Sequence, residues 1–216
     1  MGGAFYAQRM LSYCSAGMSG VGGAQEHGAD QSQQRAVEAL KERCGDFVPS
    51  DYEMDKSLLT DAKDPLFAAG RSLQDARLDY SKSKSTDALQ KALDVVLAQR
   101  DPLLMDELGA RLVTYTNPAT GRPAYFFAGK IHPLGDSPDV GLAVYLLPCE
   151  LGLRCDASEP RAQLRCASGA GCEGGRAAEV QEMLRSRPDE FAKVQLLAKE
   201  MAAAVTQGNS AAFLPR

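Results

Sequence analysis

The sequence predicts a mainly α fold, in which packed helical hairpins form a single domain with a small β-hairpin or ordered loop inserted. Three observations predict it. Apolar residues recur at helical spacing, aspartate-proline and glycine signals bound those segments, and aromatic residues gather in one short stretch. With 216 residues and 44% hydrophobic side chains, the chain can bury a substantial core. We expect the domain to cover residues 1–210 and residues 211–216 to form a loose tail.

The N-terminal part of the chain predicts two helices and the start of a third. The first helix is expected over residues 3–15 and the second over residues 31–44, where a glycine follows. Residues 17–30 between them are rich in glycine and have no hydrophobic period, so we expect a flexible connector. The Pro-Ser-Asp sequence at residues 49–51 is typical of the capped start of another helix.

Two later segments open with the same Asp-Pro-Leu phrase, Asp64-Pro65-Leu66 and Asp101-Pro102-Leu103. Aspartate at the N-cap and proline at the first helical position predict a helix start at each. A further helix is expected over residues 85–99. The two starts lie 37 residues apart, close to the period of tetratricopeptide-like solenoids, although the apolar positions do not superpose beyond the first turn. Two interpretations of this spacing therefore remain open: a true repeat, and two independently capped helices.

Residues 114–136 differ in character from the rest of the chain. Turn-forming residues surround a short aromatic run there, which predicts a β-hairpin of residues 124–128 against 130–134, or an ordered loop. This segment is the candidate interaction surface, since functional loops gather on rigid scaffolds. The alternative is a hairpin folded onto the helical core with its rings buried. The candidate residues are Tyr115, Tyr125, Phe126, Phe127 and His132.

The C-terminal part predicts three helices, over residues 139–151, 158–167 and from Pro188 to Gly208. The last has apolar residues alternately three and four positions apart, which gives it one buried face.

The cysteines indicate disulfide bonds. The last four form two copies of C-x-x-G-x-x-C, in which the glycine ends a helix in the left-handed conformation and the chain turns back. We expect all six to be paired, with local pairs within each copy, although three connectivities of these four are possible. Free thiols remain an alternative, and zinc fits poorly because its ligands lie closer together. The six are Cys14, Cys44, Cys149, Cys155, Cys166 and Cys172.

Paired cysteines predict a periplasmic or secreted protein. Residues 1–5 lack the basic and apolar regions of a signal peptide, so an exported protein would have to begin after the cleavage site. A net charge of −4 argues against nucleic-acid binding. No run approaches the ~20 apolar residues of a membrane span, and no motif predicts a cofactor or metal site.

The C-terminal motifs resemble those of a group of uncharacterised bacterial exported proteins. The resemblance rests on Tyr145-Leu-Leu-Pro-Cys149-Glu-Leu-Gly-Leu-Arg-Cys155, on Cys166-Ala-Ser-Gly-Ala-Gly-Cys172 and on a terminal helix that opens with Pro-Asp-Glu. Members of that group also carry Asp-Pro-Leu-Leu helix starts upstream. The resemblance implies export and a helical structure, and it supplies no activity and no catalytic residue.

Two functions are expected from different classes. The first is a binding protein of the bacterial envelope or secretome, with a protein or another envelope component as its partner. The alternative is a cell-wall-directed hydrolase, a lysozyme-like glycosidase with paired carboxylates, for which Glu107 and Glu150 lie in the most apolar surroundings. Whether the protein is an enzyme remains open: convergent acids in a concave site would favour the hydrolase, and an exposed apolar patch the binding protein.

Overall fold

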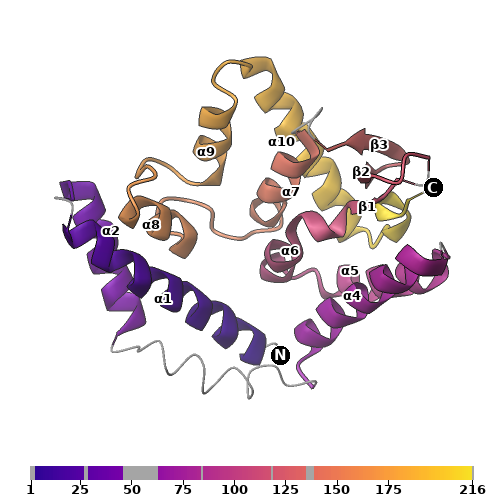
Figure 1. Ribbon diagram of the computed structural model, residues 1–216, viewed down its shortest axis with the longest axis horizontal. Coiled ribbons are helices and arrows are strands. Elements are labelled where there is room, and N and C mark those ends of the chain that lie inside the picture. Colours follow the sequence, from indigo (N-terminus) through magenta and orange to yellow (C-terminus); the bar gives the residue numbers. More distant parts are fainter. Residues whose placement is uncertain are drawn as a thin grey trace. The chain divides into compact units, whose positions relative to one another are not determined.

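The computed structural model of the chain describes residues 3–26, 29–45, 63–83, 85–117, 119–134 and 139–215. These residues form a mainly α fold with one small antiparallel sheet, which confirms the predicted fold class (Figure 1). The helices are α1 (Gly3–Glu26), α2 (Gln31–Cys44), α4 (Pro65–Ser83), α5 (Asp87–Gln99), α6 (Pro102–Leu108), α7 (Asp139–Glu150), α8 (Pro160–Ala167), α9 (Arg176–Met183) and α10 (Pro188–Thr206). The 3-10 helices are η1 (Gly109–Leu112) and η2 (Ser210–Phe213), and the strands are β1 (Thr114–Thr116), β2 (Pro123–Phe127) and β3 (Lys130–Pro133).

The chain divides into two compact units. Unit 1 comprises Met1–Phe67 and Arg154–Glu182, and unit 2 comprises Ala68–Leu153 and Met183–Arg216. The expectation of a single domain over residues 1–210 stays a prediction. The predicted helix start at residues 49–51 lies outside the described residues.

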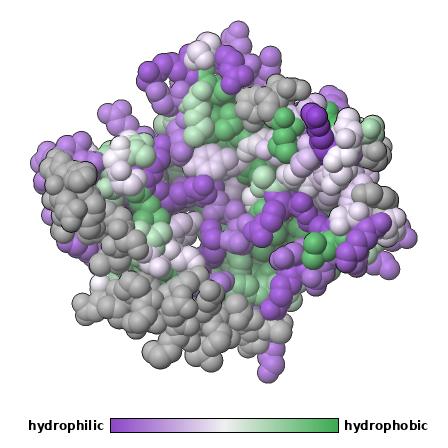
Figure 2. All heavy atoms as spheres, viewed as in Figure 1, coloured by the Kyte–Doolittle hydropathy of each residue, from purple (hydrophilic) through white to green (hydrophobic). Residues whose placement is uncertain are grey.

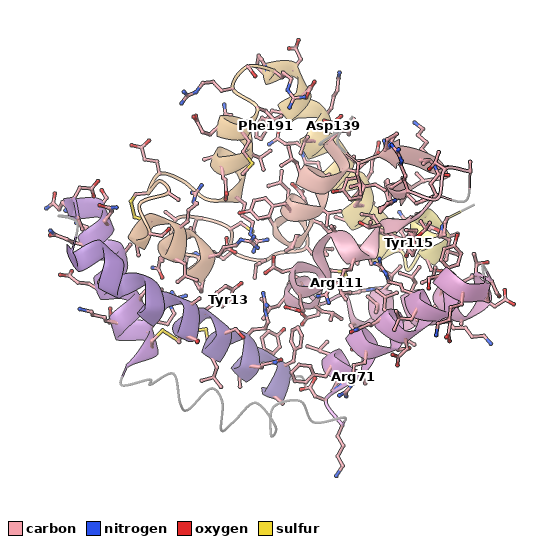
Figure 3. The ribbon with its side chains drawn as sticks, in the orientation of Figure 1. Tyr13, Arg71, Arg111, Tyr115, Asp139 and Phe191 are labelled. Atoms are coloured by element: carbon pink, nitrogen blue, oxygen red, sulfur yellow. A yellow bond between two sulfur atoms is a disulfide. The ribbon has the colours of Figure 1, made fainter. Side chains whose placement is uncertain are left out.

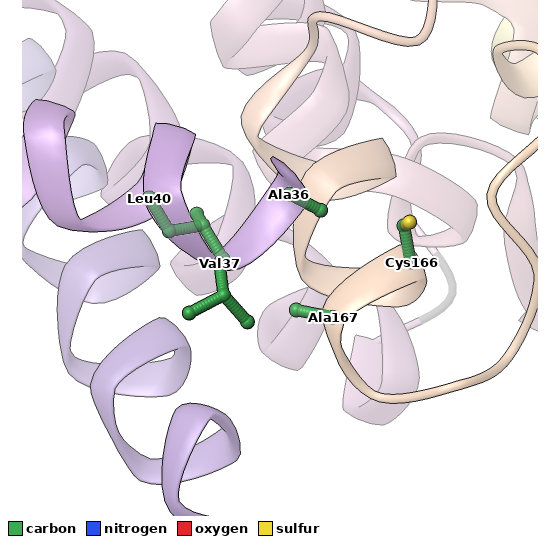
Figure 4. Packing of buried hydrophobic residues seen from close by; sticks show 5 residues of the cluster. All are labelled: Ala36, Val37, Leu40, Cys166 and Ala167. Carbon is green, nitrogen blue, oxygen red and sulfur yellow. The ribbon is translucent and has the colours of Figure 1, made fainter. Parts of the chain in front are cut away.

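Unit 1 is built on α1, α2 and α8, which pack against one another. An aspartate at residue 30 caps α2 with a capping box. Gly45 follows the last turn of α2, as predicted from the sequence. The buried cluster between α2 and α8 consists mainly of small side chains, which lets the two helices approach closely (Figure 4). It contains Ala36, Val37, Leu40, Cys166 and Ala167.

Helix α1 continues to Glu26, so the prediction of a flexible connector is wrong for residues 17–26. The reason is close packing at Gly17, where an added Cβ would lie 3.1 Å from a methyl group of Leu164 and 3.6 Å from one of Leu40. Glycine inside a helix costs roughly 0.5–1 kcal/mol relative to alanine. Tertiary packing, which local patterns do not contain, offsets such a cost.

All six cysteines are disulfide-bonded, as predicted, and this fits a protein that matures in an oxidising compartment. Cys166 pairs with Cys172, and Cys149 and Cys155 are also disulfide-bonded. The longer α1 explains the bond between Cys14 and Cys44, whose Cα atoms lie 5.5 Å apart (Figure 3). Cys14 lies roughly 18 Å before the end of α1 and Cys44 roughly 20 Å after the start of α2, at ~1.5 Å per residue.

A buried ion pair joins α8 to α9, a helix that the sequence analysis does not predict. The guanidinium of Arg176 donates to the carboxylate of Glu159, with Nε 3.0 Å from Oε1 and 3.2 Å from Oε2, and Nη2 also contacts Oε1. The two side chains are 1% and 4% exposed. The backbone is equally tight beside them, because a Cβ on Gly175 would lie 1.6 Å from the carbonyl oxygen of Cys155. A side chain therefore cannot be accommodated at Gly175 without moving the backbone.

Asp64 is a buried helix cap that serves the first turns of two helices through contacts that lie within unit 1. Its Oδ1 accepts from the backbone N–H groups of Leu66, at 3.0 Å, and Phe67, at 3.4 Å, at the start of α4. Its Oδ2 accepts from the N–H of Phe5 in the first turn of α1, at 3.2 Å. The predicted helix start is therefore present, and the same carboxylate also holds the N-terminus of α1.

We expect Asp64→Ala to lower the free energy of unfolding by about 1–3 kcal/mol, because buried N–H groups lose their acceptor. Asp30→Ala is the matched control, since Asp30 caps α2 at the exposed surface. That substitution is expected to cost about 1 kcal/mol or less. Urea denaturation, monitored by circular dichroism, measures the free energy of unfolding of both variants. Equal losses of unfolding free energy in the two variants would contradict the inference that a buried cap contributes more than an exposed one.

Unit 2 has its core between α7 and α10, the two helices with the most extensive contact. Val140 and Leu147 on α7 and Val194 and Met201 on α10 are all completely buried. Asp101 caps α6, with its Oδ1 accepting from the N–H of Leu104 at 2.8 Å, as the Asp-Pro signal predicts.

The two Asp-Pro-Leu phrases open helices of very different length. Helix α4 has 19 residues and α6 has 7. This favours two independently capped helices over a repeat.

The predicted hairpin is present as strands β2 and β3, with Phe127 opposite Lys130 and Ala124 opposite Pro133. Residues 128 and 129 form its turn with positive φ angles of 50° and 77°. The structure adds a third strand, β1, whose Thr116 pairs with Pro123 on the other edge of β2. A strand of three residues is too short to give a periodic pattern, so the sequence did not predict it.

The prediction of a loose C-terminal tail is wrong for residues 211–215. Residues 210–213 form η2, and the carbonyl oxygen of Ala212 accepts from the N–H of Ala128 at 2.8 Å. The ring of Phe213 is completely buried and lies 5.4 Å from that of Phe127, centroid to centroid. One aromatic side chain near the C-terminus therefore anchors the tail, because burying it stabilises by about 1.5–3 kcal/mol.

Candidate functional site

A cavity of about 320 Å³ lies within unit 2, between α4, the α6–η1 turn and β1. Helix α4 supplies the largest share of its lining, from positions 70 to 81 at helical spacing. Figure 2 shows hydrophilic residues along the solvent side of α4 with separate hydrophobic ones between them. The lining residues are Gly70, Leu73, Gln74, Arg77, Leu78, Tyr80, Ser81, Leu108, Arg111, Tyr115 and Thr116.

Arg77 is held in place by two contacts. Its Nη2 donates to the carbonyl oxygen of Thr114 at 2.6 Å, and its guanidinium carbon lies 5.1 Å from the centre of the Tyr115 ring. Its Nη1 is buried and makes no hydrogen bond within the described part of the chain. Burial lowers the pKa of Arg77, the Tyr115 phenol opposes that shift and the charge of Arg111 adds to it. The side chain stays positively charged, because an arginine is not deprotonated in proteins.

Arg111 on η1 is the second cation of the cavity (Figure 3). Its Nη2 lies 3.0 Å from Oε1 of Glu107, one helical turn earlier, and also donates to the Glu107 carbonyl oxygen. Its Nε donates to the carbonyl oxygen of Leu108 at 3.3 Å. These bonds orient a side chain that is otherwise about half exposed.

Aromatic rings form the inner wall of the cavity. The Tyr115 ring makes edge-to-face contacts with Tyr80 at 5.8 Å and with Phe126 at 5.9 Å between centroids. The Tyr115 hydroxyl donates to the carbonyl oxygen of Leu112 at 3.2 Å. Burial raises the pKa of Tyr115 and also that of Tyr80, so both phenols are neutral at physiological pH.

The structure brings one of the predicted interaction residues, Tyr115, to the cavity. Phe126 is buried behind it, and Phe127 is buried against Phe213. Tyr125 and His132 are half-buried and face each other across β2 and β3. The segment therefore does not present its aromatic side chains on one surface, because adjacent strand residues point to opposite faces.

His132 lies on β3 and does not line the cavity. Burial lowers its pKa, the charge of Lys130 lowers it further, and Asp139 opposes both effects. Each of these groups is on β3 or at the start of α7.

The two glutamates named for a hydrolase do not line the cavity. Glu107 is ion-paired with Arg111, and Glu150 is exposed at the end of α7. Among the residues that the structure describes, no three His, Cys, Asp or Glu side chains are grouped closely enough to hold a metal ion. In the same part of the chain, no helix combines the length and apolar character needed to cross a bilayer.

The sequence patterns do not single out the residues of α4 that line the cavity. A stripe of buried residues at Leu66, Ala69, Leu73, Ala76 and Tyr80 runs along this helix. Arg77 lies at the edge of that stripe. An arginine beside an apolar stripe is the sequence signal that could have indicated a charged group in the cavity. The signal is not specific, because many long charged side chains lie along the edge of a core in the same way.

Comparison of the chain with models of protein families, with curated proteins and with solved structures found no match in any of the three.

Proposed function

We propose that the protein is an exported, disulfide-stabilised binding protein that holds a small ligand in the cavity of unit 2. The observation that carries the proposal is the composition of that cavity, which combines leucine and tyrosine walls with a few oriented polar groups. Small-molecule sites have this composition and occupy roughly 300–1,000 Å³. A volume of about 320 Å³ favours a ligand, or a chemical group of a larger partner, that is small.

The complete pairing of the cysteines supports export, and the periplasm or secretome of a bacterium is the location we propose. The partner that carries the ligand is proposed to be a protein or another component of the cell envelope. The cavity has no pair of carboxylates within its described lining, so binding is favoured over hydrolysis.

Filling the cavity tests this function. Gly70 lies in the middle of α4, and a Cβ there would lie 3.9 Å from Leu104, which is an ordinary contact. We expect Gly70→Leu to fold, because leucine favours a helix by about 1 kcal/mol over glycine, and to occlude the cavity. Ser72→Leu is the matched control, since it adds the same side chain at an exposed position of α4 that does not line the cavity.

The readout is an NMR titration of backbone amides with phenylacetate, phenylacetamide and 2-phenylethylamine, which share one apolar body. At least one of the three compounds is expected to change the chemical shifts of backbone amides around the cavity in the unmodified protein and in Ser72→Leu. None of the three is expected to do so in Gly70→Leu. Loss of the cavity as a binding site is thus separated from loss of fold. Binding of no compound, or equal binding by Gly70→Leu, would refute the proposed function.

A further inference from the structure

The charge of the cavity lining is opposite to that of the whole chain. The chain has a net charge of −4, yet the described lining residues include two arginines and no aspartate or glutamate. Cationic groups on a wall of low dielectric raise the local potential and attract anions. Charge complementarity therefore favours an anionic ligand over a neutral or cationic one.

Arg77 has one donor group that no acceptor in the described part of the chain pairs with. Nη2 is occupied by the Thr114 carbonyl and the guanidinium plane is packed against Tyr115, so the side chain is already oriented. Its buried Nη1 has no acceptor within the described residues. The guanidinium of Arg77 is therefore an oriented cation in the cavity lining, and its hydrogen bond to the Thr114 carbonyl leaves its charge without a carboxylate partner.

The charge balance favours a single negative charge on the ligand. Arg111 is largely neutralised by its ion pair with Glu107 at 3.0 Å, whereas the side-chain hydrogen bond of Arg77 goes to a backbone carbonyl and not to a carboxylate. The pocket thus carries about one uncompensated positive charge. A carboxylate supplies one negative charge and planar oxygens that suit a guanidinium.

The rest of the lining selects an apolar body for this ligand. Leu73 and Leu108 are almost completely buried and Tyr80 lies beside them in the wall. Leu78, which is 55% exposed, forms part of the same lining at the solvent side. An apolar group beside the carboxylate would cover these side chains and exclude water from the charged contact, which strengthens it.

We infer that the cavity binds a monocarboxylate with a compact apolar body, whose carboxylate lies beside the guanidinium of Arg77 and near Arg111. This inference rests on the proposed function and names its ligand class. Free small acids and the C-terminal carboxylate of an apolar residue in a partner protein share this chemistry.

A matched charge series tests the inference on the unmodified protein. Phenylacetate is expected to bind at least about tenfold more tightly than phenylacetamide, because a hydrogen bond to a charged group is worth roughly 1.5–3 kcal/mol. Phenylethylamine is expected not to bind. Equal affinity for the acid and the amide would overturn the carboxylate assignment while leaving a binding cavity, so this failure is distinct from failure of the proposed function.

Arg77→Gln is the variant that locates the carboxylate. It is expected to reduce phenylacetate affinity about tenfold and leave that of phenylacetamide unchanged. Arg71→Gln is the matched control, because Arg71 is exposed on the same helix and does not line the cavity. If Arg77→Gln fails to fold, Arg111→Gln replaces it and is expected to weaken phenylacetate binding. Unchanged phenylacetate affinity in the folded variant would overturn the inference.

A further titration distinguishes a free small acid from the C-terminus of a partner protein as the source of the carboxylate. The tripeptide Ala-Ala-Phe and its C-terminal amide are titrated beside phenylacetate. Preference for the peptide acid over phenylacetate assigns the carboxylate to the C-terminus of a partner, and the reverse preference assigns it to a free acid. Either result supports the carboxylate site, and binding of the peptide amide as tightly as the peptide acid contradicts it.

Discussion

Arg176→Met is expected to lower the free energy of unfolding by about 3–5 kcal/mol, because it leaves the carboxylate of Glu159 buried without its partner. Both side chains are almost completely enclosed, and the guanidinium contacts both carboxylate oxygens. Urea denaturation of the purified, oxidised protein measures the loss. A change as small as that of an exposed ion pair would contradict this assignment.

Two controls separate the buried charge from the loss of packing. The double variant Glu159→Met with Arg176→Met removes both charges, and we expect it to recover most of the stability that the single variant loses. Arg154→Met removes an exposed pair with Asp156, whose side chains are 80% and 51% exposed. That substitution is expected to leave the free energy of unfolding nearly unchanged.

Removal of the bond between Cys14 and Cys44, by replacing both with alanine, is expected to cost about 3–4 kcal/mol. The bond closes a loop with a sequence separation of 30 residues, which strongly restricts the unfolded chain. It also joins α1 to α2 within unit 1. Thermal and urea unfolding with and without a reductant measure the loss.

Replacing Cys166 and Cys172 with alanine is the matched control, since their separation is only 6 residues. The chain-entropy model then gives a smaller loss of about 2 kcal/mol. The order of the two losses is the test. A larger loss for the short loop would show that local packing, and not loop closure, governs what these bonds contribute.

Local signals in the sequence were sufficient to predict the boundaries of several helices. Asp101 and Pro102 start α6, Gly45 ends α2, and Pro188 starts α10. Each of these signals acts through hydrogen bonds or fixed φ angles within one turn, so it needs no distant partner. The doubled cysteine pattern likewise predicted local pairs, because a glycine turn brings its own two cysteines together.

The predictions for other elements were wrong or missing for one physical reason. Helix α1 continues past Gly17 because Leu40 and Leu164 pack against it, and the tail is ordered because Phe213 reaches Phe127. The stabilising groups are far away in sequence, so neither hydrophobic period nor glycine content contains the information. The same holds for β1, whose pairing depends on β2.

By itself, the sequence determined the helical class and the starts of the helices that carry an Asp-Pro or proline signal, and it favoured paired cysteines over free thiols. Only the tertiary structure decided where charge and apolar surface meet. Arg77, Arg111 and Tyr115 come from a helix, a 3-10 turn and a strand, and they converge because those elements pack together. Local patterns follow from interactions within a few residues, whereas a binding cavity is a product of long-range packing.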